Sequence, residues 1–191
     1  AGNFGISRDP GSFATYGYRK YFTDRDRNAV LRLSMDGLTE ISNYGMYDYF
    51  RDKFSEITTS SSQGAIVGGW DIYNKQYVLS LQTFDESVLG WTSFFSYKPN
   101  QIFSIKSNYY TLNNGSLYKH YSNNTRGSFY GVTSKTSITF VFNPKISLSK
   151  VFQTINYEGS NGWQIDSFVS DSTGFDLSLN NNWVEYNDTA N

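Results

Sequence analysis

The 191-residue chain contains no cysteine and a single histidine, His120. The lack of cysteine excludes disulfides and thiolate metal sites, although it leaves the cellular compartment open. One histidine excludes a multi-histidine metal site and argues against a Ser-His-Asp catalytic triad. Since His120 stands between Lys119 and Tyr121 on an expected strand, we expect it to lie on the surface.

A charge excess of one sign is also missing, because Lys and Arg number 16 and Asp and Glu 17, for a net charge of −1. The chain therefore has no basic field to hold nucleic acid or anionic lipid. No apolar run reaches the roughly 18 residues that span a bilayer, and no signal peptide is visible. Because residue 1 is alanine rather than methionine, we expect a processed product, an engineered polypeptide or a fragment.

Aromatic residues are abundant instead, at 18% of the chain, and only 3 prolines and 16 glycines argue against low complexity. Aromatic side chains favour strands and supply large contact areas, so the simplest interpretation is core packing and cross-strand pairing. The alternative is a subunit interface or a sugar-stacking surface. In that case we expect exposed tryptophans to bind, with Trp70, Trp91, Trp163 and Trp183 as candidates.

The segment from Tyr21 to Ile41 predicts three strands separated by two turns. Asp24 to Asn28 is polar, and Asp and Asn tolerate the tight backbone angles of a turn. Asp36-Gly37 is a strong hairpin signal, because glycine accepts the positive φ that such turns need. A similar unit follows at Trp70 to Leu81, whose turn begins with an aspartate 47 residues after Asp24. This spacing is typical of the blades of a β-propeller.

The whole chain predicts ten to twelve short strands with regularly spaced turns, which indicates an all-β domain. Among them are strands at residues 76–82, 137–142, 149–157 and 163–169, a turn at 83–87, a bulge at Gly90 and a hairpin turn at Asn113-Asn114-Gly115. Repeats of about 45 residues favour a propeller-like fold, and a β-sandwich is the alternative because the second half repeats less regularly. We expect a single domain or a fragment of a larger propeller. Its expected parts are residues 1–57 as a first blade plus a helix, 64–169 as further blades and 170–191 as a polar tail.

One inserted amphipathic helix is expected near residues 44–57, begun by Ser42 or Asn43. Its apolar stripe is predicted at Met46, Phe50, Phe54 and Ile57. This stripe must pack on another surface. The nearest sheet is the expected acceptor, and a neighbouring subunit is the alternative.

The first polar turn has the beginning of a calcium loop, in which Asp24, Asp26 and Asn28 would supply oxygen ligands. The motif fails at position six, where Ala29 replaces glycine, and at position twelve, where Met35 replaces glutamate. We therefore predict a salt-bridged turn and assign no metal ligand.

Neither acids nor glycines indicate a catalytic or cofactor site. A glycosidase pair could be drawn from Asp85, Glu86, Glu158 and Asp166. Such a pair needs a separation of about 5–10 Å, which a sequence does not show. Gly68-Gly69 is not followed by the Gly-Lys-Ser/Thr of a phosphate loop. We expect no catalytic residue, no cofactor-binding residue and no enzyme activity.

Several long aromatic motifs resemble a known family. They are Gly2 to Ser7, Asp9 to Ala14, Tyr21 to Arg27, Val30 to Ser34, Gly90 to Pro99, Asn114 to His120 and Phe129 to Gly131. Together, over most of residues 1–165, they resemble a segment of the very large virion tail proteins, of muzzle or nozzle type, found in crAss-like and related short-tailed phages. Tyr21 to Gly37 is also similar to a propeller blade of the NHL-repeat type.

This resemblance implies a non-catalytic structural component of a phage tail, located in the virion and assembled as a ring around a DNA-conducting tube. Its implied partners are other copies of itself, neighbouring tail proteins and the rest of a longer parent chain. DNA would be only transient cargo, because a nearly neutral protein surface around the tube would not bind its phosphates strongly. A β module that binds a receptor or a host-surface carbohydrate is the alternative, and a glycosidase is the least favoured.

Overall fold

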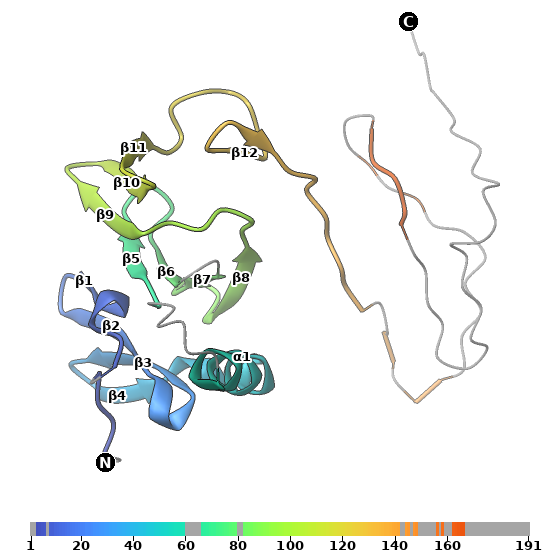
Figure 1. The fold of residues 1–191 in the computed structure, drawn as a ribbon. Coiled ribbons are helices and arrows are strands. Elements are labelled where there is room, and N and C mark those ends of the chain that lie inside the picture. The colour runs from blue at the N-terminus through green and yellow to red at the C-terminus, as the bar shows by residue number, and fades with distance from the viewer. Residues whose placement is uncertain are drawn as a thin grey trace, which may run out of the picture. The chain divides into compact units, whose positions relative to one another are not determined.

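The computed structural model describes residues 3–6, 8–59, 66–79, 82–141, 144–145, 147–148, 156, 158 and 162–166. It divides into two compact units, Ala1–Thr139 and Phe140–Asn191. The helices and strands assigned to the described residues all lie in the first unit (Figure 1). They form several antiparallel sheets and one α-helix, with no sheet closed into a barrel, which confirms the all-β class.

The first sheet is a four-stranded meander in which each strand pairs with the next. Its strands are β1 (Ala14–Tyr16), β2 (Arg19–Asp24), β3 (Ala29–Ser34) and β4 (Gly37–Glu40). A 3₁₀ turn, η2 (Arg25–Arg27), joins β2 to β3, and Asn28 ends it in the left-handed region at φ 55°. Gly37 has φ 106° at the next turn, so both expected turns are present.

The second sheet is also a four-stranded meander. Its strands are β5 (Gly68–Asp71), β6 (Gln76–Leu79), β7 (Gln82–Asp85) and β8 (Gly90–Phe94). The sequence predicted one strand over residues 76–82 and a turn at 83–87, which is wrong because β7 occupies most of that turn. The bulge expected at Gly90 lies instead at Thr92 of β8, which has no partner where the pairing shifts between Thr83 and Phe84 of β7.

The third sheet has three strands, β9 (Gln101–Ile105), β10 (Asn108–Asn113) and β11 (Ser116–Lys119). Asn114 and Gly115 form the predicted hairpin turn with φ 48° and 80°. A short hairpin of β12 (Ser128–Phe129) and β13 (Val132–Thr133) follows. The strand expected at 137–142 is not formed over residues 137–141. Those expected at 149–157 and 163–169 lie mostly outside the described residues.

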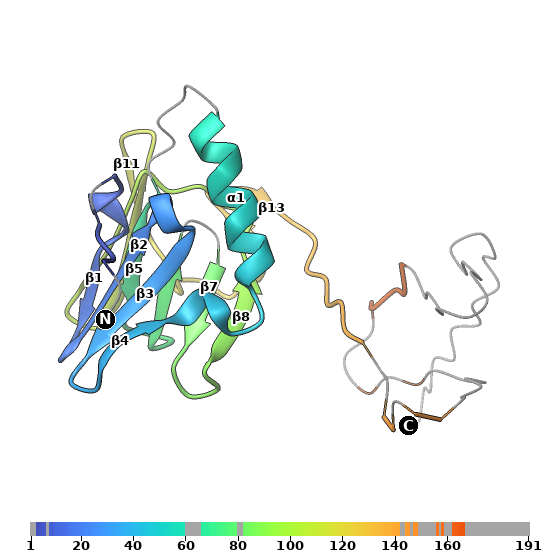
Figure 2. The ribbon, with the colours of Figure 1, turned by 90° about the horizontal axis from the view of Figure 1, so that it is seen from below.

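The three sheets pack face to face, with the second between the first and the third (Figures 1 and 2). The first interface buries aromatic and aliphatic side chains, including Tyr21, Val30, Trp70, Tyr77, Leu79 and Phe84. The second buries Val67, Val78, Ile102 and Tyr109. Strand β5 lies beside both β1 and β9, so the sheets approach one another at their first strands.

Two glycines permit this close approach. A Cβ at Gly69 would overlap the side chain of Ile102 on β9, and a Cβ at Gly68 would overlap the carbonyl oxygen of Ser12. The Gly68-Gly69 pair is therefore a packing feature of β5. Its role is to let backbones and side chains of neighbouring sheets come close.

The α-helix α1 (Tyr47–Thr59) packs against the first two sheets. Phe50 and Phe54 are buried in the first interface, and Met46 and Ile57 pack against it, so the predicted stripe is confirmed. Ser42 does not cap the helix: it lies in the 3₁₀ turn η3 (Ile41–Asn43), and its Oγ accepts a hydrogen bond from the Val30 amide. No helix of the described segments is long and apolar enough to cross a membrane.

The 47-residue spacing does not connect equivalent strands. Asp24 ends β2, the second strand of its sheet, whereas Asp71 ends β5, the first strand of its sheet. The described residues form stacked meanders and no closed propeller, and they give no support to NHL-type blades.

Candidate functional site

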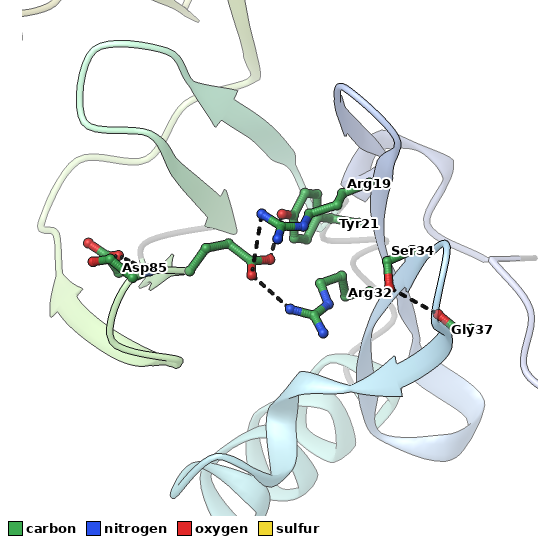
Figure 3. A network of polar contacts seen from close by, with 8 residues as sticks. Arg19, Tyr21, Arg32, Ser34, Gly37 and Asp85 are labelled. Atoms are coloured by element: carbon green, nitrogen blue, oxygen red, sulfur yellow. Dashed lines mark hydrogen bonds and ion pairs between the residues drawn. The ribbon is translucent and has the colours of Figure 1, made fainter.

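The first two sheets are joined at the carboxylate of Glu86, which lies in the turn between β7 and β8. Figure 3 labels the three side chains that contact this carboxylate, Arg19, Tyr21 and Arg32. The Tyr21 hydroxyl donates a hydrogen bond of 2.6 Å to its Oε1, and the Arg32 guanidinium donates one of 2.7 Å to its Oε2. Arg19 lies 3.6 Å from the same Oε2. All three donors come from β2 and β3. A single glutamate from the second sheet therefore binds three side chains of the first sheet.

Burial makes this joint stronger than a surface ion pair. The side chains of Glu86 and Arg32 are only 11% and 14% exposed. Charge-assisted hydrogen bonds are roughly twice as strong as neutral ones, and water screens them less where they are buried. Burial, together with the bond to Glu86, raises the pKa of the Tyr21 phenol, which keeps Tyr21 a neutral donor.

The neighbouring acid, Asp85, serves its own turn and strand. It accepts hydrogen bonds from the side chain and amide of Ser87 and from the amide group of Gln76 on β6. These bonds hold the pKa of Asp85 below its usual range. A glycosidase acid needs a raised pKa. Asp85 and Glu86 are therefore bound in structural contacts, and the other two candidates, Glu158 and Asp166, are exposed acids of the second unit.

The acids of the first polar turn are bound by arginines and amides. Asp24 contacts Arg27 at 3.2 Å and accepts a hydrogen bond from the Gly5 amide, and Asp26 contacts Arg8 at 3.0 Å. The predicted salt-bridged turn is confirmed. Within the part of the chain that the structure describes, no group of three or more His, Cys, Asp or Glu residues could hold a metal ion.

A second joint connects the second and third sheets through Asp71. Its carboxylate accepts hydrogen bonds from the Tyr73 and Asn74 amides, which closes the turn after β5. It also accepts one of 2.6 Å from the hydroxyl of Tyr121, whose ring stacks on Tyr73 at 4.6 Å. Nearby, the Ser104 hydroxyl of β9 donates to the carbonyl oxygen of Trp70 on β5 at 2.5 Å.

His120 is not the surface residue that we predicted. It is half-buried among aromatic rings, and its Nε2 lies 2.8 Å from the hydroxyl of Thr111. Thr111 also lies 2.8 Å from the hydroxyl of Tyr130, which ties the β12–β13 hairpin to the third sheet. Burial lowers the pKa of His120. Tyrosine and phenylalanine are frequent over positions 97–130, and this frequency could have predicted an aromatic cluster around His120.

The tryptophans do not form an exposed sugar-stacking surface on the first unit. Trp70 is 6% exposed and is stacked by Tyr16 at 4.2 Å. Trp91 is half-buried, and its indole N–H donates to the carbonyl oxygen of Ile41. Trp163 of the second unit is 49% exposed. Trp183 lies outside the described residues.

A groove of about 350 Å³ lies over β5, between β1 and β9. Its lining includes Phe13, Tyr16, Trp70, Phe103, Ser104 and Lys106. The side chains of Phe13 and Tyr16 are partly exposed there. The groove places aromatic side chains beside the hydroxyl of Ser104 and the ammonium group of Lys106.

Two comparisons with known proteins agree with each other. Residues 124–189 match the family described as the Crassvirus muzzle protein C-terminal domain. A muzzle protein of Bacteroides phage crAss001 is 28% identical over 104 residues, which make up 54% of this chain and 7% of that protein. Both matches are to muzzle proteins.

These matches support the muzzle-type resemblance of the sequence and confirm the expected phage-tail location. The region similar to the muzzle C-terminal domain includes the β12–β13 hairpin of the first unit and continues through the second. Since this chain spans only 7% of the crAss001 muzzle protein's length, the role of the whole protein is a matter for proposal.

Proposed function

We propose that this chain is a segment of a longer phage muzzle protein and acts as a non-catalytic structural part of the virion tail. The match of residues 124–189 to the Crassvirus muzzle protein C-terminal domain carries this proposal. The chemistry of the first unit is consistent with it. The best-placed acids, Glu86, Asp71, Asp24 and Asp85, all hold strands and turns together.

The stacked meanders also suit a structural component of the tail. Consecutive sheets pack face to face and meet at their first strands, which is how neighbouring blades of a propeller are arranged. We propose that the three sheets are consecutive blades completed by further polypeptide. In this proposal residues 1–57 form the first blade with its helix, residues 64–169 contribute further blades and residues 170–191 form a polar tail.

In the virion, copies of the protein would surround the tail tube and contact one another and neighbouring tail proteins. DNA would pass as transient cargo, for which a net charge of −1 avoids strong phosphate binding. Immunogold labelling of purified virions, with antibodies raised against this chain, tests the location. Label on the tail is expected. Label confined to the capsid, or absent from virions that lyse host cells normally, would contradict the proposal.

A second candidate function is the binding of a host-surface glycan in the groove over β5. The partly exposed rings of Phe13 and Tyr16, with Lys106 beside them, favour this candidate. A glycan array tests it with the Tyr16→Ala variant as the matched control. Saccharide binding that the variant abolishes would support it, and no binding by the unaltered chain would reject it.

A further inference from the structure

The face of the first sheet that points away from the second sheet is covered at one end only, where Leu31 is fully buried and Asp24 accepts a hydrogen bond from the Gly5 amide of the N-terminal segment. Tyr21, Val30 and Arg32 point toward the second sheet, where they contact its core and Glu86. Successive side chains of a strand alternate between faces, so Leu33 points the other way. Leu38 stands directly opposite Leu33 on β4, which places the two leucines as a cross-strand pair on the outer face.

This outer face exposes large apolar side chains. Leu33 is 44% and Leu38 40% exposed. Tyr18 and Met35 occupy the β1–β2 and β3–β4 turns at the same end of the sheet, and they are 84% and 85% exposed. We call these four residues the end patch. A solvated face of an antiparallel sheet normally carries polar residues, so a contiguous apolar group marks an interaction surface.

We infer that the end patch is the packing surface for a further β-sheet of the same polypeptide, outside residues 1–191. This inference rests on the proposed function, in which the chain is a segment of a longer muzzle protein. The crAss001 relative has room for such a sheet, because the matched region makes up only 7% of its length. The sheets of this chain already pack on one another by such apolar faces.

Area favours a partner in the same polypeptide over a second copy. A stable interface between separate proteins buries roughly 800 Å² per partner. Four side chains, two of them only partly exposed, offer a small apolar centre for such a contact. A partner joined through the same chain binds at a high effective concentration, so a small apolar contact is enough to hold it. The polar neighbours Lys20 and Asp36 would form the rim of this contact.

Site-specific photo-crosslinking in assembled virions tests this inference. Met35 is replaced by p-benzoylphenylalanine, a change that its exposure allows without disturbing the core. Tyr18 provides a second position, and Asp48 on the exposed side of α1 is the matched control. After irradiation, mass spectrometry identifies the joined peptides, and gel mobility separates links within one polypeptide from links between two.

The expected result is a link within one polypeptide, from Met35 and Tyr18 but not from Asp48, to a peptide outside residues 1–191. A covalent dimer, a link to a different virion protein, or a yield no greater than that of Asp48 would overturn the inference. The mass of the virion band that contains this chain shows whether such a result rejects the inference alone or the proposed function as well. A band of only 21.8 kDa would show that no longer polypeptide exists and would overturn both.

Discussion

Tyr21 and Arg32 stand directly opposite each other on β2 and β3, and both bind the carboxylate of Glu86. A directly opposed pair places two side chains on one face of a sheet at close spacing. Here each residue of the pair donates one hydrogen bond to Glu86 of the second sheet. The contact fixes how the first two sheets face each other, and it uses Glu86 in a structural role.

We predict that Glu86→Gln lowers the free energy of unfolding by about 2 kcal/mol, because it leaves the largely buried Arg32 charge without its partner. Urea unfolding of the unaltered and variant chains measures this. Asp52→Asn is the matched control, since Asp52 forms an exposed ion pair with Arg51 and should change stability by less than about 0.5 kcal/mol. Equal effects of the two substitutions would show that Glu86 does not hold the sheets together.

The single histidine makes a pH prediction possible. Burial lowers the pKa of His120 in the folded state below the ordinary histidine value of 6.5. The unfolded chain therefore binds a proton at His120 before the folded chain does, and stability falls as pH drops from about 6.5 to the lowered folded pKa. NMR titration should give a pKa below 6.5, and His120→Gln should remove this part of the pH dependence. A titration above 6.5 would place His120 beside an acid and not in an apolar cluster.

Gly69→Ala should cost about 1–3 kcal/mol of stability, because the new methyl group would overlap the side chain of Ile102. Gly90→Ala is the control, since its nearest atom lies at an ordinary contact distance of 3.8 Å. Ile102→Ala removes the Cγ2 methyl group that the new side chain would overlap, so it should cost less stability in the Gly69→Ala background than in the unaltered chain. Thermal unfolding compares the four chains, and additive losses in the double variant would refute the proposed overlap.

The helix provides a fourth prediction. Phe50 is buried against Trp91, with ring centroids 4.6 Å apart, so Phe50→Ala should cost about 3–5 kcal/mol. Tyr47→Ala, on the exposed side of the same helix, should cost less than about 1 kcal/mol. Denaturant unfolding at several protein concentrations gives both values. Similar costs for the two variants would indicate that the helix does not dock on its own sheets.

Local patterns in the sequence predicted the local structure well. Residues 44–57 carried a four-four-three apolar stripe, and Asn114-Gly115 a specific turn signal, because both depend on neighbours along the chain. The contacts of Glu86 and Asp71 between the sheets were not predicted. Glu86 meets Tyr21 across 65 residues, and Tyr121 meets Asp71 across 50, so only the folded chain brings these groups together.

The same reason explains the wrong predictions. His120 is polar and sits between a lysine and a tyrosine, and only long-range packing of Tyr97 and Tyr130 around it makes it half-buried. Trp70 is covered by Tyr16, which lies 54 positions earlier. The apparent 47-residue repeat matched the turn chemistry of Asp24 and Asp71, which recurs wherever a strand enters a tight turn and so does not identify equivalent strands.

We propose that this chain is part of a longer structural polypeptide of the phage tail. Separating the proteins of purified virions by mass, followed by peptide sequencing of each band, tests it most directly. We expect peptides from residues 1–191 to occur in one virion band far heavier than 21.8 kDa, together with other peptides of the same polypeptide. Their absence from virions, or their presence only in a 21.8 kDa band, would contradict it.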